Sequence, residues 1–415
     1  MMPSNFITTL RCVVCGRDYP AKAIYTCPAC GEGGILDVQY DYATIVTQLT
    51  RDILTQRQRE IWRYRELLPV DPETARPHLQ TGWTPIYNAP ALAQEIGIEE
   101  VFVKDEGRNP TGSFKDRASA IGVVKAKEFG YEEIACASAG NAAASMAGMA
   151  AAVGLRSFIF VPGRTPEPKL AQLLAFGATV FKVNGSYDQA YDLCMQACAQ
   201  FGWYNRNSAI NAYLVEGKKT AGLEIAEQMA DNVPDWISVA VGDGCTLAGI
   251  WKGLQEMQQL GFIQKLPRML GVQAEGAAPL VSAFKEQRAP EFIQATTVAD
   301  SICVGRPRNW RKALAALRAS EGRMIAVSDD EILTAQRLLG GKAAVFAEPS
   351  GAAALAGLQK AIAYGEVSKS SRALAVITGN GLKDVQSALR ATGKAHAIDA
   401  NLESLLKVVT EKACG

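Results

Sequence analysis

At 415 residues the chain is too long for one simple core, so two or three domains are expected. Its 43 Lys and Arg residues almost balance its 42 Asp and Glu residues, and no long run of like charge occurs. This balance argues against nucleic acid or an anionic membrane as the main partner, and neither is expected.

Neither a membrane span nor a secretory signal is evident. Residues 142–155 form the most apolar stretch, but it is shorter than a bilayer span and rich in Ala and Gly, which predicts a buried helix. Residues 1–11 lack the basic start and apolar core of a signal peptide, so a cytoplasmic location is expected. With only two histidines, a Ser-His-Asp triad or a multi-histidine metal site is not expected.

Four of the ten cysteines form two Cys-x-x-Cys pairs near the N-terminus, and a glycine follows each pair. Paired knuckles of this kind suit tetrahedral thiolate coordination of zinc, with a structural rather than a catalytic role. Two disulfides or a redox dithiol are the alternatives. Residues 1–42 are therefore predicted to form a zinc-ribbon-like module with the ligands Cys12, Cys15, Cys27 and Cys30.

From residue 100 onward, strand and helix patterns alternate, which predicts parallel sheets covered by helices on both faces. Ligands in such folds bind at the carboxyl ends of the strands. A helical linker is expected over residues 42–68. Strands are predicted at residues 101–104, 134–138, 157–161, 179–183, 237–241, 269–273, 324–327 and 374–378. Helices are predicted at residues 141–153, 169–176, 187–201, 216–229, 247–260, 329–339 and 402–410, with a Ser328/Glu331 capping box.

The most informative segment is residues 109–117, Asn-Pro-Thr-Gly-Ser-Phe-Lys-Asp-Arg. Pro and Gly indicate a turn, and Ser113 is predicted to cap the helix that follows. Lys115 then falls in the first helical turn, where the positive end of the helix dipole opposes protonation. A neutral amine is what Schiff-base chemistry with pyridoxal phosphate (PLP) requires. The alternative is a surface lysine at a helix start.

Three further turns end predicted strands. The loop at residues 138–141, Ser-Ala-Gly-Asn, offers helix amides to a carboxylate or phosphate, unless Asn141 is an ordinary N-cap. The turn at residues 241–246, Val-Gly-Asp-Gly-Cys-Thr, suits a phosphate only if the Asp243 carboxylate points away. Thr378 closes the last strand, where its hydroxyl could bind a heterocyclic nitrogen; a plain Gly-Asn turn is the alternative.

The order of these segments resembles the fold-type II PLP enzymes, and among them the threonine synthase family. The resemblance runs from about residue 60 to residue 388. It is carried by residues 62–69 (Trp-Arg-Tyr-Arg-Glu-Leu-Leu-Pro), 82–85 (Gly-Trp-Thr-Pro), 105–117, 216–220 (Glu-Gly-Lys-Lys-Thr) and 378–384 (Thr-Gly-Asn-Gly-Leu-Lys-Asp). It implies a large PLP-binding α/β domain at residues 43–117 and 213–415, a smaller mobile α/β domain at residues 118–212, and a homodimer.

The resemblance also implies residue roles. Lys115 would form the Schiff base and move the proton, Asn141 would contact the phenolic oxygen, and Thr378 would bond the pyridine nitrogen. The cofactor phosphate would be held by the turn Gly242, Asp243, Gly244, Cys245 and Thr246. The amino-acid substrate would be bound by Ser138, Ala139, Gly140 and Lys218.

The implied reaction converts O-phosphohomoserine and water to threonine and phosphate. One departure concerns the substrate phosphate, because Leu214 stands where relatives commonly carry an arginine. Candidate replacements are Arg117, Arg164, Arg206, Lys218, Lys219 and Arg306. The alternatives are a β-replacement synthase acting on O-phosphoserine, as in cysteate synthesis, a serine/threonine dehydratase, or an inactive zinc-ribbon interaction protein.

Overall fold

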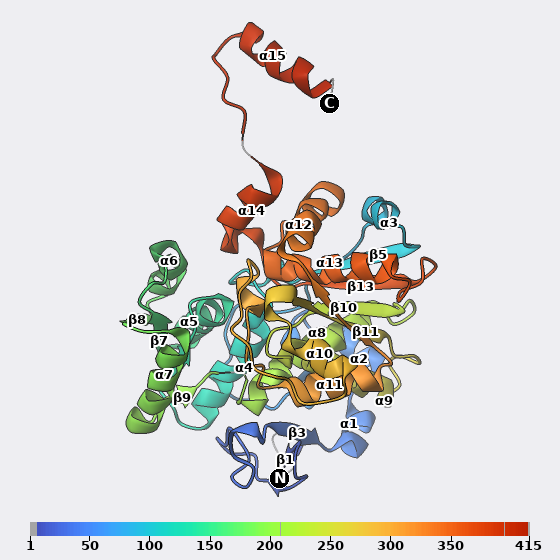
Figure 1. Ribbon diagram of the computed structural model, residues 1–415. Coiled ribbons are helices and arrows are strands. Elements are labelled where there is room, and N and C mark those ends of the chain that lie inside the picture. Colours follow the sequence, from blue (N-terminus) through green and yellow to red (C-terminus); the bar gives the residue numbers. More distant parts are fainter. Residues whose placement is uncertain (1–5, 208, 394, 414–415) are drawn as a thin grey trace.

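The structure is a computed structural model, and it describes residues 6–207, 209–393 and 395–413. Three separate β-sheets organise the chain (Figure 1). The N-terminal module lies at one end of the molecule, and the C-terminal helix lies apart from the body at the other (Figure 1).

The largest sheet has six strands in the order β12-β11-β10-β13-β5-β4. Every neighbouring pair is parallel except β4 and β5, which are antiparallel. The sequence missed β4, because it has only three residues and two of them are exposed. The strands are β4 (Ile86–Asn88), β5 (Glu100–Asp105), β10 (Trp236–Ala240), β11 (Arg268–Ala274), β12 (Arg323–Val327) and β13 (Arg372–Ile377).

The second sheet has four parallel strands in the order β8-β7-β6-β9. Three of its strands were predicted from the sequence. The fourth contains two residues, too few for a pattern to be read. The strands are β6 (Glu133–Ala137), β7 (Arg156–Pro162), β8 (Thr179–Val183) and β9 (Tyr204–Asn205).

The N-terminal sheet is antiparallel and consists of β1 (Ile7–Cys12), β2 (Asp18–Tyr19) and β3 (Leu36–Tyr40). The helical linker predicted over residues 42–68 consists of three short helical segments. Helix α1 (Tyr42–Gln48) ends at Leu49, and Thr50 caps α2 (Arg51–Thr55) by accepting from the Ile53 amide. A separate 3₁₀ segment, η2 (Ile61–Leu67), follows. Side-chain caps inside a polar segment break a helix in this way.

The predicted helices are confirmed with shifts of a few residues at their ends, and Ser328 and Glu331 form the expected capping box. The prediction that Ser113 caps the helix of Lys115 is wrong, because the N-cap residue is Phe114. The helices of the body are α3 (Pro90–Ile96), α4 (Lys115–Glu128), α5 (Asn141–Val153), α6 (Glu167–Ala175), α7 (Tyr187–Phe201), α8 (Ala212–Gln228), α9 (Cys245–Gln259), α10 (Pro279–Lys285), α11 (Trp310–Ala319), α12 (Asp329–Ala343), α13 (Pro349–Ala363) and α14 (Val385–Thr392).

Helix α8 crosses both α4 and α9 at close range. A Cβ atom on Gly217 would lie 2.2 Å from the Arg117 carbonyl oxygen, and one on Gly222 would lie 2.1 Å from the Ile250 carbonyl oxygen. Only glycine allows backbones to approach so closely. The crossings fix the starts of α4 and α9 relative to each other.

A buried cluster of ion pairs stabilises the crossing of α4 and α8. The Arg117 side chain donates to Glu106 at 2.7 and 2.8 Å and to Glu224 at 2.6 and 2.7 Å, and all three side chains are fully buried. Burial alone would raise the pKa of Glu224, but Arg117 and Lys104 hold it at about 2. The cluster therefore stays ionised near neutral pH.

The chain ends in helix α15 (Leu402–Ala413), which is confirmed where the sequence predicted it. In Figure 1 it lies apart from the sheets, and most of residues 402–410 are exposed. Among the described residues, no helix has the length and apolar character needed to cross a membrane.

We predict that Glu224→Ala lowers the free energy of unfolding by about 3–5 kcal/mol, because it leaves the buried Arg117 guanidinium half paired. Chemical denaturation followed by circular dichroism measures the loss. The control is Glu403→Ala, which removes an exposed ion pair with Lys407 on α15 and leaves the unfolding midpoint in place. Equal midpoints for the two variants would contradict the prediction.

Candidate active site

Lys115 is the first residue of α4, at the carboxyl end of β13. The Phe114 amide donates to the Thr378 carbonyl oxygen at 2.9 Å, and Ser113 forms a β-bridge with Gly379. The lysine and Thr378, which are far apart in the sequence, therefore lie on adjoining backbone segments.

The Lys115 amine lies among buried groups. Burial, followed by the neighbouring Lys218 cation, lowers its pKa to about 8, although Glu348 acts in the opposite direction. The start of α4 adds the positive end of a helix dipole. A substantial share of the amine is thus neutral near physiological pH, as a nucleophile requires.

The glycine-bearing turn joins β10 to α9. Gly244 has a φ of +93°, and a Cβ atom there would lie 2.7 Å from the Ala313 Cβ, so the position requires glycine. The Asp243 carboxylate accepts from the Arg308 amide at 3.2 Å. One oxygen of this carboxylate is therefore directed toward the loop before α11.

Cys245, the first residue of α9, lies near Lys115. Its side chain is buried, and it lies close enough to Lys115 and Lys218 to influence the pKa of both amines. Within the described chain, no side chain caps the N-terminus of α9.

Asn141 lies at the start of α5, but the N-cap residue is Gly140, so Asn141 is not the ordinary cap that the sequence left open. Its side-chain amide donates to both Glu348 carboxylate oxygens at 2.9 Å and to Ser301 Oγ at 3.1 Å. Ser138 Oγ accepts from the Gly140 amide at 3.1 Å and shapes the loop.

Glu348 is a site residue that sequence reasoning missed. It is buried, and burial raises its pKa against the opposing effects of Asn141, Lys115 and Lys383. It is the residue before Pro349 at the start of α13, a position that reads as an ordinary helix entry. A carboxylate at a helix N-terminus gives no sequence signal that it faces a distant lysine.

A cavity of about 230 Å³ opens between the two larger sheets. Two polar contacts cross it from α6, since Lys169 pairs with Asp300 at 2.8 Å and Lys383 donates to Gln172 at 2.6 Å. The walls are formed by Ala139, Gly140, Asn141, Ala144, Lys169, Ala171, Gln172, Asp300, Ser301, Glu348, Pro349, Ser350, Leu382, Lys383 and Asp384.

Three of the six candidate cations for a substrate phosphate are paired with carboxylates elsewhere. Arg117 is held by two carboxylates, and Lys219 pairs with Glu216 and Glu256. Arg164 is exposed, and Arg306 pairs with Glu32 of the N-terminal module. Arg206 and Lys218 are buried, and both influence Lys115.

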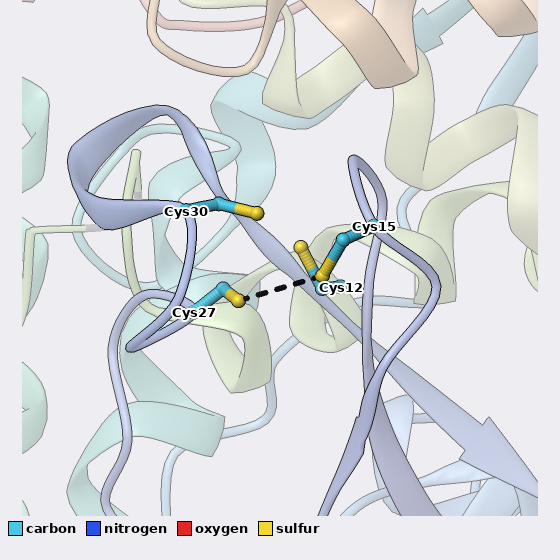
Figure 2. A group of neighbouring side chains, drawn as sticks. All are labelled: Cys12, Cys15, Cys27 and Cys30. Carbon is cyan, nitrogen blue, oxygen red and sulfur yellow. Dashed lines mark hydrogen bonds between the residues drawn. The ribbon is translucent and has the colours of Figure 1, made fainter.

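The four N-terminal cysteines converge, as Figure 2 shows. Their sulfur atoms all lie within 4.8 Å of one another, and those of Cys15 and Cys27 are 3.8 Å apart. Tetrahedral zinc with Zn–S bonds of about 2.3 Å separates its sulfur ligands by about 3.8 Å. A Cβ atom on Gly34 would lie 2.6 Å from the Cys30 Cβ, so glycine is required beside the cluster.

The residues around Lys115 fit PLP. The amine has a lowered pKa, and a glycine turn with uncapped amides faces the same region. Ser113 Oγ is buried without a hydrogen-bond partner in the described chain, so a polar group is available there for a ligand.

Residues 78–379 match the family model described as pyridoxal-phosphate dependent enzyme. The chain is 40% identical over 406 residues to a threonine synthase of Methanocaldococcus jannaschii, covering 97% of this chain and 99% of that protein. It is also 40% identical over 409 residues to a threonine synthase of Methanosarcina acetivorans, with the same coverage.

Solved structures with the same fold include the processed form of threonine deaminase isoform 2 from Solanum lycopersicum (TM-score 0.63, 22% identity, 80% of this chain and 84% of that one). Maize serine racemase is similar (TM-score 0.64, 20% identity, 80% of this chain and 92% of that one). At these identities the likeness shows the fold alone, and it confirms the expected fold-type II α/β architecture.

We predict that PLP added to cofactor-free protein and reduced with borohydride modifies Lys115. The extent of trapping rises with pH and is half-maximal near pH 8, because the amine reacts only after it loses its proton and its pKa is lowered to about 8. Peptide mass spectrometry locates the modified residue. Trapping that persists in Lys115→Ala, or that needs a pH above 10, would contradict this.

Proposed function

We propose that Lys115 bears the cofactor, on the premise that the chain belongs to the pyridoxal-phosphate-dependent enzyme family and, within it, to the threonine synthases. The enzyme is a PLP-dependent lyase. The observation that supports the assignment of Lys115 is its amine of lowered pKa, which lies beside the glycine turn before α9 and next to the end of β13.

The proposed reaction converts O-phosphohomoserine and water to threonine and phosphate. Bound PLP supplies the electron sink for the carbanion formed at the substrate α-carbon. The neutral Lys115 amine would remove the α-proton and then a β-proton, after which phosphate leaves the γ-carbon. The amine would return protons to the γ- and α-carbons, while the hydroxyl group of water adds to the β-carbon and the remaining proton of that water leaves with the phosphate.

We extend the proposal to the remaining roles that the family resemblance implies. Asn141 holds the phenolic oxygen and Thr378 the pyridine nitrogen. The substrate carboxylate binds the loop Ser138, Ala139 and Gly140. The cofactor phosphate binds the turn formed by Gly242, Asp243, Gly244, Cys245 and Thr246 through its backbone amides and the hydroxyl of Thr246.

We divide the chain into an N-terminal module at residues 1–42, a large domain at residues 43–117 and 213–415, and a smaller domain at residues 118–212. The smaller domain includes the four-stranded sheet and closes over the substrate. The contacts of Lys169 with Asp300 and of Gln172 with Lys383, which cross the cavity, support a closed position.

The N-terminal module binds a structural zinc ion through Cys12, Cys15, Cys27 and Cys30. The Val14 amide donates to Cys12 Sγ at 3.4 Å, as zinc knuckles require. Free thiols in the described chain suit a cytoplasmic enzyme. We also propose a homodimer, on the family resemblance, which light scattering tests.

The proposed reaction is tested by offering three substrates to the holoenzyme. We predict that O-phosphohomoserine yields threonine and phosphate, and that threonine yields 2-oxobutyrate only as a minor product. Lys115→Ala loses at least about 10³-fold in rate, because the covalent amine and the proton carrier are both removed.

Two outcomes would replace this function. Faster reaction of O-phosphoserine with a sulfur nucleophile would identify a β-replacement synthase, and dominant deamination of threonine would identify a dehydratase. Full activity in Lys115→Ala would remove the lysine from the mechanism.

We predict that the purified protein contains about one zinc ion per chain and that Cys15→Ser loses it together with thermal stability, since structural zinc contributes directly to folding. Elemental analysis and thermal unfolding measure both effects. Cys303→Ser, outside the cluster, is the matched control. Zinc retained at full occupancy in Cys15→Ser would exclude the proposed ligand set.

A further inference from the structure

Arg206 is a buried cation with no ion pair among the residues that the structure describes. It follows β9, its amide donates to the Ala135 carbonyl oxygen at 2.9 Å, and its side chain is almost completely buried. Within the described chain, its guanidinium donates only to Ser119 Oγ, at 2.9 and 3.2 Å. A neutral hydroxyl does not compensate a buried positive charge.

The surroundings add positive charge. Arg206 lowers the pKa of both Lys115 and Lys218, so the three cations lie close together. Asp116 is the carboxylate that influences the pKa of Arg206, and its two oxygens accept from the amide and hydroxyl of Thr111 at 2.7 and 2.5 Å. Burial raises the pKa of Asp116 to about 6, so this carboxylate is mostly ionised at pH 7 and is directed at Thr111.

The position of Arg206 favours a substrate group over the cofactor phosphate. β9 pairs with β6, and β6 leads into the loop at residues 138–140 proposed for the substrate carboxylate. Ser119 lies on α4, about one turn beyond Lys115. The turn at residues 242–246 belongs to the other sheet and has its own amides for the cofactor phosphate.

We propose that Arg206, together with Lys218, binds the phosphate of the amino-acid substrate and sets the specificity for a phosphorylated substrate. This inference rests on the proposed function. An arginine fork matches two phosphate oxygens, and the ammonium of Lys218 adds a point charge. Leu214, where the sequence led us to look for an arginine, is buried and packs against α4 at Gly122.

The test compares holoenzyme carrying Arg206→Gln, Arg206→Lys or, as control, Arg164→Gln at an exposed position. Three constants are measured for each protein: KM for O-phosphohomoserine, the inhibition constant of inorganic phosphate, and the dissociation constant of PLP. For Arg206→Gln we expect the first two to rise by about 30-fold or more, while the dissociation constant of PLP stays within about twofold. Arg206→Lys recovers part of the loss, and Arg164→Gln matches the unmodified protein.

Two other outcomes would overturn the role proposed for Arg206. An unchanged inhibition constant for phosphate in Arg206→Gln would overturn the proposal and leave Arg206 a structural role. A parallel rise in the dissociation constant of PLP would also overturn it, because the arginine would then hold the cofactor phosphate. Thermal melting followed by circular dichroism identifies a misfolded variant. If Arg206→Gln is misfolded, the test rests on Arg206→Lys, which keeps the positive charge but lacks the guanidinium fork and should therefore bind phosphate more weakly than the unmodified protein.

The two hypotheses fail separately. If the unmodified holoenzyme does not convert O-phosphohomoserine, yet inorganic phosphate perturbs its cofactor absorbance in an Arg206-dependent way, the proposed function fails and the anion site stands. If threonine forms but the binding of phosphate does not depend on Arg206, the proposed function stands and the role inferred for Arg206 fails.

Discussion

The crossing of α4 over α8 is the constraint on which the rest of the structure depends. Gly217 lets the two backbones come together, and Arg117 then binds Glu106 and Glu224 in the interior. Because Arg117 lies two residues after Lys115, the same ion cluster holds the start of α4 in place. The position of Lys115 therefore depends on buried ion pairs that take no direct part in the proposed chemistry.

The site built around this lysine is electropositive in its interior. Lys115, Lys218 and Arg206 are mutually repelling, whereas Glu348 is held by Asn141 and burial raises its pKa. Such an arrangement is unfavourable in the empty protein and becomes favourable when anions bind. On the proposed assignments, a phosphorylated cofactor and a phosphorylated amino acid would bring negative charge to these cations.

The N-terminal module is integrated with the body. Tyr40 donates to Glu216 at 2.8 Å, and Lys252 connects Glu216 with Asp37 of the module at 2.8 and 3.1 Å. Since Glu216 begins the Glu-Gly-Lys-Lys-Thr segment on α8, the module contacts the helix that carries Lys218. A zinc-stabilised module would thereby support the helix next to the site without touching the substrate.

Periodicity, spacing and turn chemistry are local properties, so they predicted the strand and helix alternation, the cysteine pairs and the turns that contain Lys115, Gly244 and Thr378. The sequence did not determine the start of α4, since the backbone pairing of Ser113 with Gly379 comes from another strand. Glu348 was out of reach, and the sequence offered Arg206 only as one of six candidate cations, because a buried charge is significant only through neighbours distant in the chain. Folding separates these cations, since it pairs three of them with carboxylates and buries Arg206 and Lys218 near Lys115.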